Sequence, residues 1–147
     1  MKKICLVAAI ALFTSIQLKA QKEQIYTSNS YAIAGYDPVA YFKNEKAVKG
    51  KKEYSYHWKD ANWLFSTKED MDLFAANPEK YAPQYGGYCA YGLSEGHKAP
   101  PDPNTWTIVD GKLYFNYSKD VKTMWIKNPK ERIQEADKQW SSIKDKE

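Results

Sequence analysis

Two β-hairpin patterns, one at residues 53–65 and one at residues 105–117, constrain the fold of this chain more than any other feature. Residues 53–59 alternate between polar and aromatic side chains, which predicts a strand with one aromatic face made by Tyr54, Tyr56 and Trp58. Residues 63–65 can return as the partner strand. In the second pattern two apolar runs flank Asp110-Gly111-Lys112, and the glycine can take the positive φ of a tight turn.

Helical signals follow the first hairpin. Ser66-Thr67-Lys68-Glu69 has the spacing of a capping box, in which the serine hydroxyl and the glutamate satisfy free N–H groups at a helix start. We therefore expect a helix from about Thr67. Asn77-Pro78 should end it and open a short helical turn through Tyr81.

Two more helices are expected after the second hairpin. Ser118 can cap a helix that runs towards Trp125, and Asn128-Pro129 can start the last one. The last helix carries one apolar stripe, which should pack across the sheet and consists of Ile133, Ala136, Trp140 and Ile143.

The remaining segments are predicted to be less regular. Residues 35–38 suit a turn, followed by a short strand at residues 39–42. The polar residues 21–30 predict a loose, flexible leader, and residues 44–52 a solvated loop. Residues 82–104, rich in glycine, proline and tyrosine, predict a long irregular loop that its aromatic content keeps ordered. Together these elements predict a small single domain of the α+β class, with two hairpins forming a sheet packed by helices.

Residues 1–20 have the pattern of a secretory signal. Lys2 and Lys3 precede an uncharged, mainly apolar run, and Ala20 offers a small residue for cleavage. The run is shorter than the roughly 20 residues of a membrane-spanning helix. We therefore expect a periplasmic or secreted chain without a stable membrane anchor, in which residues 31–147 form the domain.

Loss of that signal would change both the charge and the cysteine content. The formal net charge of +4 would fall to near +1, which removes the usual electrostatic support for nucleic-acid binding. Cys5 would also be removed, so the exported chain would hold Cys89 alone and could form no internal disulfide. A lone exported thiol is buried and inert, or it is reactive, metal-bound or paired with another molecule.

The residues around Cys89 favour chemistry without specifying it. The preceding pair Gly86-Gly87 can present a side chain at a tight turn. A reactive thiol needs its pKa lowered by a neighbour, for which the candidates are His57, His97 and Lys98. The alternative is a small buried apolar residue, as free cysteines commonly are.

A soft-metal site is one hypothesis, because cysteine with histidine suits copper or zinc. Its candidate ligands are Cys89, His97, which follows eight positions later, and His57, for which an exposed place on its strand is the simpler interpretation. A structural zinc site has four protein ligands, and the chain has neither of the usual ligand pairs, Cys-x-x-Cys or His-x-x-x-His. A redox-active Cys89 is a second hypothesis.

Other catalytic schemes lack their residues. The chain has no Gly-x-Ser-x-Gly, no phosphate-binding Gly-x-x-x-x-Gly-Lys and no dinucleotide fingerprint. The chain contains the residues for a cysteine–histidine pair in acyl transfer and for paired carboxylates among Asp37, Asp102 and Asp110, but their spacing does not favour either scheme. The non-catalytic alternative is a ligand- or protein-binding module in which Cys89 only packs and the platform consists of Tyr85, Tyr88 and Tyr91.

The stretch Pro-x-x-Tyr-x-Pro-x-Tyr-Gly-Gly-Tyr-Cys-Ala at residues 78–90, with residues 35–42 and 63–66, resembles the exported YHS domain proteins. The match spans roughly residues 31–117. The resemblance implies a compact α+β domain. Some members of this group carry selenocysteine at the position of Cys89, which implies a redox-active or soft-metal-binding atom there.

Shorter YHS modules of metal-handling proteins bind soft metals through cysteines, and this chain departs from them. It has Ala40 and Phe65 where they have cysteines, so any metal would have to lie around Cys89, with His97 or His57. The partner would then be a metal ion such as copper, or an external thiol, because a resolving cysteine is missing. A reachable lone cysteine could also link two copies of the chain.

Overall fold

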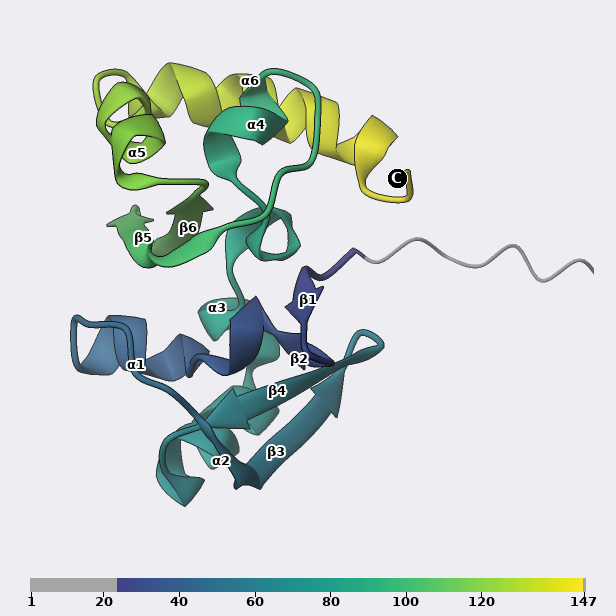
Figure 1. Cartoon of the computed structure of the whole chain (residues 1–147), viewed down its shortest axis with the longest axis vertical. Coiled ribbons are helices and arrows are strands. Elements are labelled where there is room, and N and C mark those ends of the chain that lie inside the picture. Colours follow the sequence, from purple (N-terminus) through teal and green to yellow (C-terminus); the bar gives the residue numbers. More distant parts are fainter. Residues whose placement is uncertain (1–23, 147) are drawn as a thin grey trace, which may run out of the picture.

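The computed structural model describes residues 24–146, so the proposed signal at residues 1–20 lies outside the described residues. The elements in chain order are β1 (Thr27–Ser28), β2 (Tyr31–Ala32), η1 (Ile33–Gly35), α1 (Pro38–Lys43), β3 (Lys51–Trp58), β4 (Ala61–Phe65), α2 (Lys68–Ala76), α3 (Pro78–Tyr81), η2 (Gln84–Gly87), α4 (Ala90–Ser94), β5 (Asp102–Val109), β6 (Lys112–Asn116), α5 (Lys119–Trp125) and α6 (Pro129–Ile143). They form two halves: β1 to β4 with α1 to α3, drawn lower in Figure 1, and β5 and β6 with α4 to α6, drawn above. The α+β class is confirmed.

The first predicted hairpin is present and belongs to a four-stranded sheet of order β1-β2-β4-β3. β3 and β4 pair antiparallel, with Tyr56 opposite Trp63 and Trp58 opposite Ala61. The alternation in β3 has the expected effect: its aromatic face is half-buried, and Tyr56 and Trp58 contact the ring of Phe74 edge-on. The solvated loop predicted for residues 44–52 ends where β3 begins, at Lys51.

The loose leader predicted at residues 21–30 is wrong for its described part. Ile25 is buried, and β1 pairs antiparallel with β2. The backbone N–H of Tyr26 donates to the carbonyl of Gly86 at 2.9 Å. This approach is possible because Gly86 has no side chain: a Cβ there would lie 1.7 Å from the carbonyl oxygen of Gln24.

The second predicted hairpin is also present, as β5 and β6. Thr107 pairs with Tyr114 and Val109 with Lys112. At the turn, Asp110 and Gly111 both have positive φ, at 50° and 74°, as in the turns that match strand twist. The two hairpins lie in separate sheets, so they do not form the common sheet expected from the sequence.

The turn and strand predicted at residues 35–42 are corrected to a capped helix. Asp37 is the N-cap of α1, and its Oδ1 accepts hydrogen bonds from the backbone N–H groups of Val39 and Ala40. Pro38 occupies the first helical position, where its fixed φ suits a helix and its missing N–H costs nothing. An aspartate cap followed by proline therefore overrides the strand preference of the apolar run that follows.

The helix expected near Thr67 is present as α2, with a different cap from the predicted one. The N-cap is Thr67, whose Oγ1 accepts from the N–H of Asp70 at 3.1 Å. Ser66, which the capping-box pattern selected, instead donates its hydroxyl to Asp37. α3 follows at Pro78, as the sequence predicted.

The long irregular loop predicted at residues 82–104 contains regular structure. η2 and the short helix α4 lie within it, and β5 begins at Asp102. The glycines that suggested a loop are needed at the end of η2, where Gly86 and Gly87 have φ of 62° and 89°.

The buried apolar side chains form two clusters, and the larger one spans both halves because Leu113 and Phe115 of β6 belong to it. The apolar stripe predicted for α6 is present, and Ala136 is fully buried. The stripe packs against Leu93 of α4 and Tyr114 of β6. The main partner of α6 is the helix α4, so the prediction that the stripe packs across the sheet is wrong. Trp125 at the end of α5 joins the same core.

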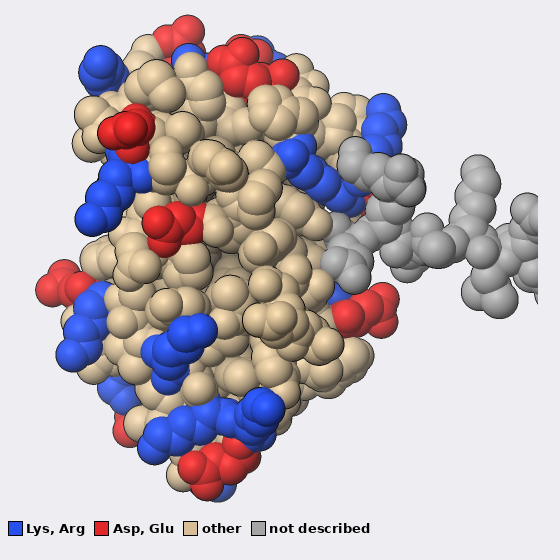
Figure 2. All heavy atoms as spheres, viewed as in Figure 1, with Lys and Arg blue, Asp and Glu red and all other residues tan. Residues whose placement is uncertain are grey.

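None of the helices formed by residues 24–146 is both long and apolar enough to span a membrane. On the face drawn in Figure 2, basic and acidic side chains are interspersed around the edge, and uncharged atoms fill the centre.

Candidate functional site around Cys89

Cys89 lies in the upper half, at the junction of α4 and β6. It is the N-cap of α4 and forms an isolated bridge with Phe115 of β6. Its backbone N–H donates to the carbonyl of Ala99 at 3.0 Å, which brings residues 97–99 back over the helix start. The side chain is 1 % exposed. These contacts fix the sulfur between a helix, a strand end and a returning loop.

The sulfur of Cys89 is saturated with hydrogen bonds. It accepts from the backbone N–H groups of Gly92 at 3.4 Å and of Tyr117 at 3.2 Å. Its own S–H donates to Oδ1 of Asn116 at 3.6 Å, and the same oxygen accepts from the N–H of Tyr91 at 3.1 Å. Asn116 is fully buried.

Burial raises the pKa of the Cys89 thiol, and the N–H groups of Gly92, Tyr117 and Tyr91 oppose that shift only in part. The thiol is therefore protonated at neutral pH. The same N–H groups would stabilise a sulfur anion once a ligand displaced the proton.

A small pocket opens over the sulfur. It has a volume of about 320 Å³ and mostly apolar walls, and it is lined by Cys89, Tyr91, Gly92, His97, Ala99, Tyr117 and Val121. Tyr117, at its rim, is 56 % exposed. Cys89 forms part of the wall while exposing almost no surface, so a ligand of the sulfur would have to be small.

His97 shares this pocket with Cys89. Its backbone N–H donates to the carbonyl of Gly92 at 3.0 Å, and a Cβ at Gly92 would lie 3.4 Å from its Nε2. Gly92 thus contacts the sulfur through its N–H, and a larger side chain at this position would press on the imidazole of His97. The sequence made His97 a candidate partner of Cys89 but did not show how the chain returns.

His57 does not join this site. It lies on the exposed face of β3 in the other half, where its Nδ1 is 2.9 Å from Oδ1 of Asn62. Across residues 24–146, no three side chains of histidine, cysteine, aspartate or glutamate are grouped in a way that could hold a metal ion. Cys89 and His97 are thus the two groups of these types that one metal ion could meet in the pocket.

The three tyrosines singled out from the sequence do not form one platform. Tyr85 is buried, and its hydroxyl donates to Asp137 at 2.8 Å; burial also raises the pKa of this hydroxyl. Tyr88 packs edge-on against Tyr26. Tyr91 stacks against the guanidinium of Arg132 at 4.1 Å and is the one of the three that lines the Cys89 pocket.

The candidate carboxylates are also separated. Asp102 accepts from the N–H of Asn104 at the start of β5, and Asp110 lies at the hairpin turn. Asp37 has a carboxylate neighbour that the sequence did not indicate, Asp70 of α2; both are buried, and Ser66 lies between them. Burial, followed by hydrogen bonding with Asp70, raises the pKa of Asp37 to about 6.

The sequence also missed Asn116 and Tyr117, which hold the sulfur of Cys89 from the end of β6. No local signal could reveal them, because they come into contact only when the second hairpin packs against α4.

Comparisons with known proteins give no support for a family assignment: no family model matches the chain, and neither the curated proteins nor the solved structures contain a significant match. The resemblance to the exported YHS domain proteins stays a prediction that rests on residues 35–42, 63–66 and 78–90.

Proposed function

We propose that this chain is an exported protein of the YHS type that binds one soft metal ion, copper(I), through the sulfur of Cys89 and the imidazole of His97. The observation that supports this is the shared pocket: both side chains line one small, mostly apolar cavity.

The ligand chemistry favours copper(I) over harder ions. Thiolate and imidazole are ligands that soft or borderline metals prefer. A structural zinc ion takes four ligands, which is more than the two that Cys89 and His97 supply. The apolar walls contributed by Ala99 and Val121 would limit solvent access to the ion.

Metal binding also accommodates the protonated resting thiol. The ion would displace the S–H proton, and the N–H groups of Gly92 and Tyr117 would remain to stabilise the anionic sulfur. Thiol exchange fits less well, since attack on a disulfide needs an exposed thiolate. A sulfur that is 1 % exposed, with a raised pKa, is poorly placed to attack a disulfide, and a metal ion would have to reach it through the pocket that it lines.

The test is a copper(I) titration of the reduced chain in competition with a chromogenic copper(I) chelator. The chain should start at Gln21, which removes Cys5 and keeps every described residue. We expect one equivalent of copper(I) to be withheld from the chelator. Cys89→Ser keeps an acceptor for the two N–H groups but removes the soft ligand, so binding should be lost.

The histidines provide a matched control. His97→Gln should weaken copper(I) binding, whereas His57→Gln, on the exposed face of β3, should leave it unchanged. If the reduced chain withholds no copper(I), or if Cys89→Ser binds as tightly as the parent chain, the proposal is wrong.

A further inference from the structure

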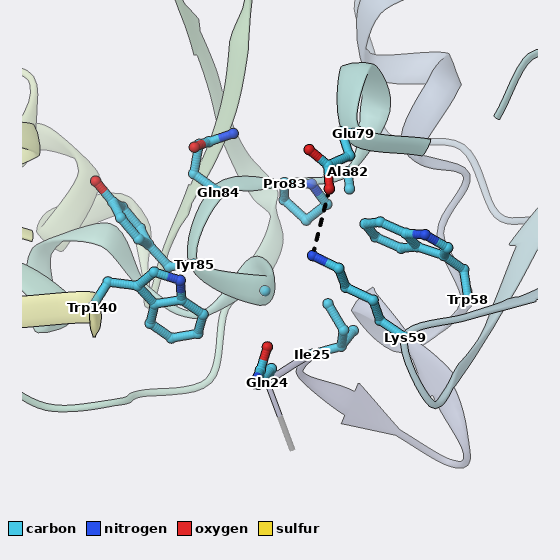
Figure 3. Close-up of a pocket in the computed structure, with 11 residues that line it drawn as sticks. Gln24, Ile25, Trp58, Lys59, Glu79, Ala82, Pro83, Gln84, Tyr85 and Trp140 are labelled. Atoms are coloured by element: carbon cyan, nitrogen blue, oxygen red, sulfur yellow. Dashed lines mark ion pairs between the residues drawn. The ribbon is translucent and has the colours of Figure 1, made fainter. Parts of the chain in front are cut away.

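A second pocket lies on the boundary between the two halves, and none of its lining residues lines the Cys89 pocket (Figure 3). Its volume is about 190 Å³. The tip of the β3–β4 hairpin, the start of α3 and the C-terminal part of α6 meet here. The residues that matter for the argument are Ile25, Trp58, Lys59, Glu79, Tyr85 and Trp140.

Two indole rings face the pocket from opposite sides (Figure 3). Trp58 comes from β3, where the rings of Trp63 and Phe74 pack against it at centroid distances of 5.9 and 5.7 Å. Trp140 comes from α6 and meets Tyr85 edge-on at 6.0 Å. Each indole is therefore positioned by its own half of the molecule, and neither is fully buried.

An ion pair crosses the space between the indoles (Figure 3). Nζ of Lys59 lies 3.8 Å from Oε1 of Glu79 and 4.7 Å from the ring centroid of Trp58. The side chains of Lys59 and Glu79 are 48 % and 79 % exposed, so the ion pair contributes little to stability. A ligand in the pocket could replace water as a hydrogen-bond partner of either group. The pocket thus presents a donor and an acceptor side by side, with aromatic rings around them.

This combination matches a ring that carries two neighbouring hydroxyl groups and has an apolar C–H face. One hydroxyl can donate to the Glu79 carboxylate while its neighbour accepts from the Lys59 ammonium, and the C–H face of the ring can pack against an indole. The pocket is smaller than the 300 Å³ or more of typical drug-binding sites, which limits the ligand to about one ring. We propose that this pocket binds a neutral monosaccharide unit, free or within a glycan.

A zwitterionic amino acid is the competing ligand class. It would have to separate Lys59 from Glu79 and bring two further charges out of water. A neutral diol leaves the ion pair in place and needs no charge to be buried.

The experiment follows the indole N–H signals of the chain from Gln21 onward by ¹H–¹⁵N correlation spectroscopy. The chain has five tryptophans, so each should give one signal. The probes are the methyl glycosides of glucose, galactose, mannose and N-acetylglucosamine, with glycine as the zwitterion. We expect at least one glycoside to shift the signals of Trp58 and Trp140 with a Kd in the millimolar range, while the buried Trp125 stays unchanged.

Two substitutions separate binding from a general effect. Glu79→Gln should weaken glycoside binding about tenfold, because it removes a charged hydrogen-bond acceptor. Glu135→Gln, which changes an exposed, ion-paired carboxylate of α6 outside the pocket, should have no effect. The proposal is overturned if no glycoside shifts either signal at about 50 mM, or if glycine alone shifts them. Because no metal is present, neither result depends on copper(I) binding at Cys89.

Discussion

Ser66 donates two hydrogen bonds to Oδ2 of Asp37, from its backbone N–H at 2.8 Å and from its hydroxyl at 2.7 Å, although 29 positions separate the two residues. Oδ1 of the same carboxylate caps α1. One buried side chain therefore joins the start of α1 to the end of β4. Asp70, which also accepts from Lys43 at 3.1 Å, lies beside it.

The first prediction concerns the pH dependence of folding. Because the pKa of Asp37 is raised to about 6 in the folded chain, the folded state binds its proton more tightly than the unfolded state does. The contribution of Asp37 to stability is therefore greatest below pH 4 and declines as the pH rises to 6, by on the order of 2 kcal/mol.

Asp37→Asn should remove this decline. The loss in free energy of urea unfolding caused by Asp37→Asn should be largest near pH 4 and smaller at pH 7. Asp110→Asn, at the exposed hairpin turn, is the control and should show no such trend. A destabilisation by Asp37→Asn that grows with pH would contradict the assigned shift.

The second prediction compares two threonines in β5. The hydroxyl of Thr105 accepts from the N–H of Asn116 at 2.9 Å and donates to its carbonyl at 2.6 Å, so Thr105→Val would leave a buried N–H without a partner. We expect a loss of about 2 kcal/mol in unfolding free energy. The hydroxyl of Thr107 is buried and unpartnered among the described residues, so Thr107→Val should be neutral or stabilising. Equal losses in the two variants would refute this reading of the hydrogen bonds.

The third prediction concerns the structural role of the Cys89 sulfur. Cys89→Ala would remove a helix cap and the acceptor for two N–H groups, at a cost of about 2 kcal/mol. Cys89→Ser keeps an acceptor in the same place and should cost less. Urea midpoints of the two variants give the comparison, and a serine variant less stable than the alanine variant would show that packing of the sulfur outweighs its hydrogen bonds.

The fourth prediction concerns thiol reactivity. Cys89 is 1 % exposed and its pKa is raised, so in the folded chain it should react with an aromatic disulfide reagent at least about a hundredfold more slowly than in urea. The rate should also keep rising at pH values above the usual range of a free thiol. A fast reaction at pH 7 in the folded chain would instead favour the redox hypothesis over metal binding.

Local signals in the sequence determined much of the secondary structure. Asp110-Gly111 specified a turn, Ser118 a helix start, and the alternation before Trp58 a strand, because each depends on residues within a few positions. Such signals failed at residues 35–42, where the apolar run after the predicted turn indicated a strand, whereas the side chain of Asp37 caps a helix.

The sequence also limited the candidates for soft-metal chemistry to Cys89, His97 and His57, since it offers few other soft or borderline ligands. The packing of the chain places His97 in the same pocket wall as Cys89 and leaves His57 in the other half. It also brings Asn116 to the thiol, and Trp58 and Trp140 to one pocket. No local pattern encodes these contacts, because they join distant segments whose approach depends on how α4 and α6 pack against the second hairpin and on how the two halves meet.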